Sequence, residues 1–382
     1  MSRFDEKTIK LKEYEVLGKL PDPFLRADGT RVSTVEEFEE HRAELYRNGV
    51  EFQYGKQPPA PEFLEIEPLY IANDGASSYR ITSGRREHPV SFIMRTYLPH
   101  GKKGCPIIVD GDLCFNYAFD KEWLNVALDN GIGIVLFNRC ELAPDVKASG
   151  RKGQMYECYP EYDFGALGAW AWGYSRCVDA LERLDLFDMN WVVFTGHSRG
   201  AKTAMLAGIL DKRARIVNPN ETCQGSCSCY RIHMNGITED GGERKSETLA
   251  DLWQHFSFWV GKEMGDYTDR EEELPFDAHY LKALVAPRAL LVGEAASDMW
   301  ANPVGSWMTT QAAKEVFKLY GKEDSLYWYF RPGYHYHKPY DLSMLVSVIK
   351  HEKDGEPLPD EFYYTPFDEP ELIYDWRCPE KK

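Results

Sequence analysis

The sequence predicts an α/β protein, in which a mainly parallel, doubly wound sheet with antiparallel N-terminal strands lies between two layers of helices, a three-layer αβα sandwich. Two observations lead to this prediction. Short apolar runs rich in β-branched residues alternate with helical stretches from residue 106 onward, which is typical of parallel strands joined by helices. Before them, residues 67–99 hold three strand-like runs joined by turns, which predicts an antiparallel start to the sheet.

Taken in order, the chain divides into an extension and one large domain. Residues 1–62 are expected to be an N-terminal extension packed on the core, with a helix capped by Ser33 or Thr34. Residues 63–382 are expected to form the α/β domain, with an insertion at about 218–274, a stretch too long for a simple loop. Strands are expected at 69–72, 79–82, 89–98, 106–109, 133–137, 192–195, 215–217, 289–292 and 326–330. Helices are expected at 121–129, 167–186, 201–210, 307–320 and 340–349.

The centre of this pattern is Gly196-His197-Ser198-Arg199-Gly200, which lies between an expected strand and an expected helix. Gly-x-Ser-x-Gly in that position is the nucleophile elbow of α/β-hydrolases, where small residues on both sides of the serine permit a sharp turn. Ser198 would project its hydroxyl at a helix N-terminus, where N–H groups and the helix dipole favour developing negative charge. The motif and the antiparallel start together predict an α/β-hydrolase fold, with residues 63–382 as its catalytic domain.

A serine nucleophile requires a histidine that takes its proton and a carboxylate that orients the histidine. In this fold the histidine follows the last strand, where the chain offers His335 and His337, and we favour His335. Two carboxylates compete for the third role. Asp298 follows the strand expected at 289–292, the usual place for the acid, whereas Glu221 follows the strand after the nucleophile helix. Spacing alone favours Asp298.

Composition argues against several classes of partner. The net charge of −16 disfavours nucleic acid and an anionic membrane surface as partners.

The first 15 residues contain no apolar run, no stretch approaches the length of a membrane span, and the nine cysteines are irregularly spaced. These features predict a cytoplasmic protein, or a secreted one if a signal peptide was removed. No phosphate-binding glycine loop or familiar zinc spacing occurs, so we expect neither a cofactor nor a metal.

Several segments resemble those of one known esterase family. The elbow and the two residues after it, Gly196 to Lys202, resemble a Gly-x-Ser-Arg-x-Gly-Lys type of motif, in which an arginine directly follows the nucleophile. Further similar segments lie at 20–23, 28–29, 169–176, 274–279 and 286–288. The family is the glucuronoyl esterases, carbohydrate esterase family 15, and the resemblance covers nearly the whole chain. It implies a serine esterase without a cofactor, which cleaves esters of D-glucuronate or 4-O-methyl-D-glucuronate, as found between xylan and lignin alcohols, through an acyl-enzyme.

The resemblance also implies which residues carry the reaction. Ser198 is implied as the nucleophile and His335 as the general base. Residues 221–231 resemble the family's Glu-Ser-Gly-x-Gly-Gly segment, whose glutamate is the triad acid, so the resemblance ranks Glu221 first. Some bacterial members carry the acid after the later strand instead, so Asp298 is the alternative or additional acid.

Contacts with the oxyanion and the sugar are implied as well. Arg199 is implied to stabilise the oxyanion through backbone and side chain, Lys202 to contact the sugar, and Trp300 to pack near it. The chain departs from the family where cysteine and serine replace glycines after the triad glutamate, and where His197 replaces a cysteine that pairs in fungal members. Two other functions therefore stay open, a carbohydrate acetyl esterase on the same scaffold and a non-catalytic saccharide-binding relative.

Overall fold

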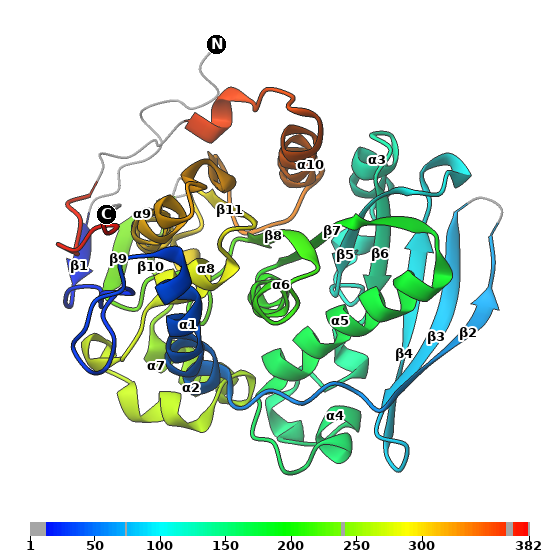
Figure 1. Ribbon diagram of the computed structural model, residues 1–382, viewed down its shortest axis with the longest axis horizontal. Coiled ribbons are helices and arrows are strands. Elements are labelled where there is room, and N and C mark those ends of the chain that lie inside the picture. Colours follow the sequence, from blue (N-terminus) through cyan, green and yellow to red (C-terminus); the bar gives the residue numbers. More distant parts are fainter. Residues whose placement is uncertain (1–12, 73–74, 238–240, 364–369, 381–382) are drawn as a thin grey trace.

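A nine-stranded mixed sheet forms the centre of the computed structural model, which describes residues 13–72, 75–237, 241–363 and 370–380 (Figure 1). The antiparallel part comprises β2 (Phe63–Tyr70), β3 (Ala76–Gly84) and β4 (Pro89–Tyr97). The parallel part comprises β5 (Cys105–Asp110), β6 (Gly133–Phe137), β7 (Phe187–His197), β8 (Ala214–Asn220), β11 (Ala289–Ala295) and β12 (Leu326–Arg331). The strand order is β12-β11-β8-β7-β5-β6-β4-β3-β2, with β4 antiparallel to β6. The predicted fold class is confirmed.

Helices cover both faces of this sheet because successive strand residues point to opposite sides. On β5, Ile107 and Val109 belong to one hydrophobic cluster and Ile108 to the other. The first cluster is covered by α5 (Ala166–Leu184), α6 (Arg199–Leu210), α8 (Ala278–Val285) and α9 (Pro303–Leu319). The second is covered by α3 (Lys121–Leu128) and α10 (Pro339–Asp354). The result is the predicted three-layer sandwich.

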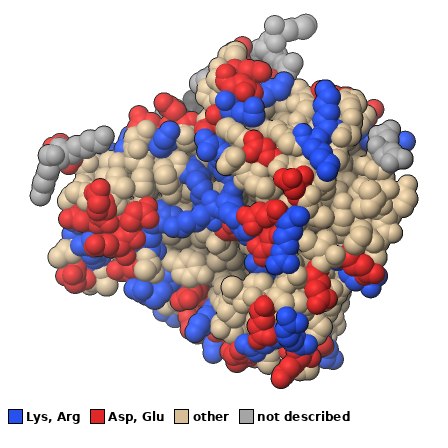
Figure 2. Space-filling model, turned by 45° about the vertical axis from the view of Figure 1, so that its right-hand side comes forward, with Lys and Arg blue, Asp and Glu red and all other residues tan. Residues whose placement is uncertain are grey.

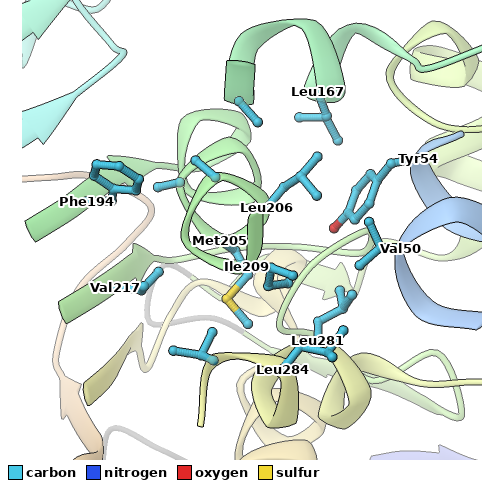
Figure 3. Packing of buried hydrophobic residues seen from close by; sticks show 14 of the residues in the cluster. Val50, Tyr54, Leu167, Phe194, Met205, Leu206, Ile209, Val217, Leu281 and Leu284 are labelled. Atoms are coloured by element: carbon cyan, nitrogen blue, oxygen red, sulfur yellow. The ribbon is translucent and has the colours of Figure 1, made fainter. Parts of the chain in front are cut away.

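Helix α6 lies in the middle of the larger cluster, surrounded by strands and helices from distant parts of the sequence (Figure 3). Its side chains Met205 and Leu206 are fully buried. The cluster around them includes Val50, Tyr54, Leu167, Phe194, Val217, Leu281 and Leu284. Since α6 begins directly after Ser198, this packing fixes the position of the elbow.

A second, three-stranded antiparallel sheet joins the N-terminal region to the insertion, and the sequence did not predict it. It has the order β1-β9-β10, from β1 (Glu13–Val16), β9 (Ile232–Ile237) and β10 (Glu243–Lys245). The N-terminal region continues with α1 (Val35–Tyr46) and α2 (Phe52–Tyr54). Two further short helices, α4 (Gln154–Cys158) and α7 (Leu249–Phe256), lie later in the chain. As predicted, Thr34 caps α1, since its side chain accepts a hydrogen bond from Glu37 N at 3.2 Å.

Both ends of the described chain are tied together and to the insertion. Leu20 N donates to Ile373 O at 2.9 Å, and Trp376 Nε1 donates to Leu20 O at 3.1 Å. From α2, Gln53 Nε2 and Tyr54 OH both donate to the carbonyl of Gly225, at 3.1 and 2.6 Å. The N-terminal residues therefore support a loop of the insertion that lies beneath the pocket described below.

Differences from the predicted elements concern mainly the sheet edge and the insertion. The first strand was expected at 69–72, but β2 ends at Tyr70 and begins at Phe63, because an edge strand with one solvated face needs few apolar residues.

On the face drawn in Figure 2, Lys and Arg side chains gather near the centre with groups of Asp and Glu around them, so the acidic charge does not form one continuous patch there. Among the described residues, every helix is too short or too polar to cross a membrane.

Candidate active site

The predicted elbow is present between β7, which ends at His197, and α6, which begins at Arg199. Ser198 adopts φ 58° and ψ −120°, a strained conformation for a residue with a side chain, which persists only where the surroundings enforce it. A Cβ on Gly196 would lie 2.5 Å from the carbonyl oxygen of Gly200, and a Cβ on Gly200 would overlap the carboxylate of Asp112. Only glycine fits at both positions, so the turn holds Ser198 at the carboxyl edge of the sheet.

Asp112 supports the elbow from the loop after β5. Its buried carboxylate accepts hydrogen bonds from His197 N at 2.8 Å and from Tyr117 OH at 2.7 Å, and it forms an ion pair with the buried Arg139. Arg139 also lies 3.7 Å from Asp145. This network was not predicted from the sequence, although an acidic pair at 110 and 112 directly after a predicted strand marks the edge where α/β proteins place functional groups.

His335 follows β12, as predicted, and both candidate acids lie beside it. Its Nδ1 is 2.6 Å from Asp298 Oδ2, a hydrogen bond, and 3.6 Å from Glu221 Oε2. Spacing had favoured Asp298 and the resemblance had ranked Glu221 first; in the structure the hydrogen bond goes to Asp298. The second histidine, His337, is buried against the rings of Tyr117 and Trp123, and burial lowers its pKa to about 4.

Glu221 is fully buried and has other partners. One carboxylate oxygen forms an ion pair with Arg331, and the other accepts a hydrogen bond from Tyr336 N at 2.9 Å. Burial raises the pKa of Glu221, and the Arg331 guanidinium opposes that rise. Arg331 in turn donates to Asp341 at 2.6 Å. Glu221 therefore holds the His335 loop in place and puts a second carboxylate close to the imidazole.

A pocket of about 570 Å³ opens above the elbow. Five predicted residues line it, namely Ser198, Arg199, Lys202, Trp300 and His335. The other lining residues are Phe115, His197, Cys223, Glu247, His255, Phe256 and Trp259. A mostly apolar wall with a few converging polar groups is typical of sites for small ligands.

Arg199 is held against an aromatic wall of this pocket. Its guanidinium carbon lies 4.8 Å from the ring centre of Trp259, and Nη1 donates to Asp145 at 3.0 Å. The Trp259 ring stacks on Phe256 with centres 3.9 Å apart, and its Nε1 donates to the same Asp145 at 2.9 Å. As the first residue of α6, Arg199 has a backbone N–H without an acceptor inside the helix, so it can serve an oxyanion beside Ser198.

Lys202 and Glu247 form a buried, charged pair that also lines the pocket. Lys202 Nζ donates to Gln224 O at 2.6 Å and lies 3.5 Å from Glu247 Oε2. Burial raises the pKa of Glu247, and Lys202 opposes that rise. Glu247 N donates to the carbonyl of Trp300 at 3.1 Å, so the three residues form one connected group. Glu247 was not predicted from the sequence, because no periodic pattern places residues within the insertion.

Among the residues that the structure describes, one set has the geometry to hold a cation. The ligand atoms of His197, Glu221 and His335 lie within 4.8 Å of one another. Burial and the neighbouring histidines lower the pKa of His197 well below its usual range, so its imidazole is neutral. However, Glu221 is already paired with Arg331, and Nδ1 of His335 is hydrogen-bonded to Asp298.

Comparison with known proteins gives one consistent result. A model of the fungal glucuronyl esterase family matches residues 81–321. The 4-O-methyl-glucuronoyl methylesterase 1 of Wolfiporia cocos is 27% identical over 327 residues, covering 84% of this chain and 76% of that protein. The carbohydrate esterase family 15 glucuronoyl esterase of Caldicellulosiruptor kristjansonii has a TM-score of 0.84 and 26% identity, covering 95% of this chain and 98% of that one.

A further solved structure contains a sugar ester. It is a variant of the Sporotrichum thermophile glucuronoyl esterase in complex with methyl 4-O-methyl-β-D-glucopyranuronate, with a TM-score of 0.72 and 25% identity, covering 90% of this chain and 89% of that one. The family model spans more than half of the present chain and includes the elbow and the insertion. The chain therefore belongs to the glucuronoyl esterases, a family of carboxylic ester hydrolases.

Proposed function

We propose that this chain hydrolyses esters of D-glucuronic acid and of its 4-O-methyl form through an acyl-enzyme. The observation that carries the proposal is the pocket that Ser198 and His335 both line, with His335 hydrogen-bonded to the buried Asp298. The same pocket holds the Lys202, Glu247 and Trp300 group, which offers charged hydrogen-bond partners and an aromatic face to a sugar ring.

In this mechanism His335 acts first as base and then as acid. With Nδ1 donating to Asp298, Nε2 accepts the proton of Ser198 while Oγ attacks the C6 carbonyl carbon. The backbone N–H of Arg199 stabilises the oxyanion, and the guanidinium adds positive potential. His335 then gives its proton to the leaving alcohol. Water attacks the glucuronoyl-enzyme in the same way, with His335 as base, and the free uronate leaves.

We assign the orienting role to Asp298, and a supporting role to Glu221. A buried carboxylate that accepts from Nδ1 fixes the tautomer and stabilises the imidazolium. Asp298 has that contact, at 2.6 Å, whereas Glu221 uses its oxygens on Arg331 and Tyr336. Glu221 then contributes mainly a nearby negative charge and the position of the His335 loop.

We further propose that residues 1–62 are an extension of a single catalytic domain. Gln53 and Tyr54 donate to Gly225 in the insertion, which fits an extension better than a separate domain.

We also propose that the protein works in the cytoplasm. Six of the nine cysteines are buried thiols, which suits a reducing compartment.

The direct test compares initial rates on benzyl D-glucuronate and on an acetylated xylo-oligosaccharide. We expect turnover of the glucuronate ester and little of the acetyl ester, because the pocket offers Lys202 and Glu247 to the acid sugar of the first substrate. Turnover of the acetyl ester alone would favour a carbohydrate deacetylase. Absence of both, together with saccharide binding and no labelling of Ser198 by a fluorophosphonate, would favour a binding protein.

Trp300 provides a test of the sugar subsite. We expect Trp300→Ala to raise KM for benzyl D-glucuronate about five- to tenfold with a smaller change in kcat, because the ring is lost from the pocket wall while Ser198 and His335 stay in place. Trp300→Phe should restore most of the affinity. Equal losses of kcat in both variants, with unchanged KM, would assign Trp300 to support of the Glu247 backbone instead.

A further inference from the structure

Two cysteines on neighbouring loops beside the pocket form a pair that the esterase mechanism does not use. Cys114 lies in the loop after β5, and Cys140 lies in the short helix Arg139–Glu141 after β6. The two loops are joined by a β-bridge between Asp112 and Asn138 and by the hydrogen bond from Arg139 N to Gly111 O at 3.1 Å. The side chains of Cys114 and Cys140 lie close enough for each thiol to change the pKa of the other. Cys114 is exposed and Cys140 is half-buried, so reagents can reach the pair.

The surroundings make Cys140 the more reactive thiol of the two. The interaction with the Cys114 thiol lowers the pKa of Cys140 to about 7, and the neighbouring Arg139 guanidinium lowers it further against the effect of burial. The same interaction raises the pKa of Cys114. Burial also raises the pKa of Cys105, Cys158, Cys177, Cys223, Cys227 and Cys229. Since the thiolate is the nucleophile in thiol–disulfide exchange, Cys140 is the expected first site of attack.

We propose that Cys114 and Cys140 are a redox modification site, at which a disulfide oxidant such as oxidised glutathione forms a reversible disulfide that slows ester hydrolysis. The Cys140 thiolate attacks one sulfur of the oxidant and releases one thiolate. Cys114 then loses its proton and attacks the Cys140 sulfur, which releases the second. The protein loses two electrons and two protons, and the oxidant leaves as two thiols. The disulfide itself does not depend on the proposed activity, whereas the effect on rate does.

The coupling to the active site follows from what each cysteine adjoins. Cys114 precedes Phe115, which lines the pocket, and Cys140 follows Arg139, which pairs with Asp112 beneath the elbow. Asp112 in turn accepts from His197 N at 2.8 Å. A disulfide holds its sulfurs about 2.05 Å apart, closer than two thiols that only contact each other, so its formation draws the two loops together. Displacements of about 1 Å near a catalytic group cost up to about 10²-fold in rate.

To test this, the purified protein is treated with oxidised glutathione at neutral pH. The state of the two thiols and the rate of ester hydrolysis are then measured. Intact mass should fall by two hydrogen atoms, peptide mapping should join the peptides that contain residues 114 and 140, and kcat on benzyl D-glucuronate should fall on the order of tenfold. Dithiothreitol should restore both. Cys114→Ser should instead keep a glutathione adduct on Cys140, and Cys140→Ser should keep neither product. Cys378→Ser, which alters a partly buried cysteine outside the pair, should respond as the wild type.

Each other outcome contradicts a stated part of the proposal. A disulfide between other cysteines, or an unchanged response of Cys140→Ser, would overturn the site. Formation of the Cys114–Cys140 disulfide at constant kcat would overturn the coupling to catalysis. If the reduced protein does not hydrolyse the glucuronate ester, the proposed function fails, and mass and peptide mapping still decide whether the modification site exists.

Discussion

Replacing Ser198 with alanine is expected to lower kcat for benzyl D-glucuronate by on the order of 10³-fold or more, because the nucleophile that forms the acyl-enzyme is removed. The residual rate would come from the oxyanion donors and from binding. Alanine is the appropriate substitute, since it keeps the strained φ of 58° that glycine would relax. Initial rates and thermal unfolding measured on the same samples separate loss of chemistry from loss of fold.

A matched serine controls for general effects of the substitution. The hydroxyl of Ser347 donates within α10 to Ser343 O at 2.9 Å, so Ser347→Ala should keep the wild-type rate. A fluorophosphonate should label the wild type and Ser347→Ala, but not Ser198→Ala. A decrease in kcat of less than about tenfold in Ser198→Ala would contradict the acyl-enzyme mechanism.

The two acids are expected to separate into a catalytic and a structural phenotype. Asp298→Asn should lower kcat by roughly 10³- to 10⁴-fold, because an amide can hold the imidazole in the wrong tautomer and cannot stabilise the imidazolium. Glu221→Gln should lower kcat by only about tenfold, but it should reduce the free energy of unfolding by about 3 kcal/mol, because it leaves the buried Arg331 without one of its carboxylates. Rates and urea denaturation of the two variants measure both effects.

The reverse pattern has an equally definite meaning. If Glu221→Gln abolishes turnover and Asp298→Asn is tolerated, then Glu221 orients His335 during catalysis, at a distance shorter than the 3.6 Å seen here. If each substitution costs only about tenfold and the double variant is inactive, then the two carboxylates share the role. A double-mutant cycle is suited to this question because both acids lie close to one nitrogen.

The sequence could predict Ser198 and His335 because their positions depend on local pattern and chain order. A strand, a Gly-x-Ser-x-Gly turn and a helix are consecutive in the chain, and the histidine loop follows the last strand. The choice between Glu221 and Asp298 could not be made in this way. Both follow neighbouring parallel strands, β8 and β11, whose carboxyl ends meet at one edge of the sheet. Only the loop conformations decide which carboxylate reaches the imidazole.

Other features depend on contacts between distant segments, and the sequence pattern does not contain them. The strand β1 is four residues long and pairs with β9 more than 200 residues later. Asp112 is identified by its partners His197, at the end of β7, and Arg139, in the short helix after β6. Glu247 occupies the pocket only because the insertion folds back over the elbow. In each case the physical cause is tertiary packing, which overrides weak local preference.

The hydrogen bonds that join Leu20 to Ile373 and Trp376 also have a consequence for biosynthesis. A ribosome releases the N-terminal segment long before its partners exist, so β1, Gln53 and Tyr54 must wait unpaired until the insertion and the C-terminal tail emerge. Contacts of such large sequence separation slow folding and prolong the exposure of apolar surface. The support that Gln53 and Tyr54 give to the loop beneath the pocket can therefore form only after the insertion has been synthesised.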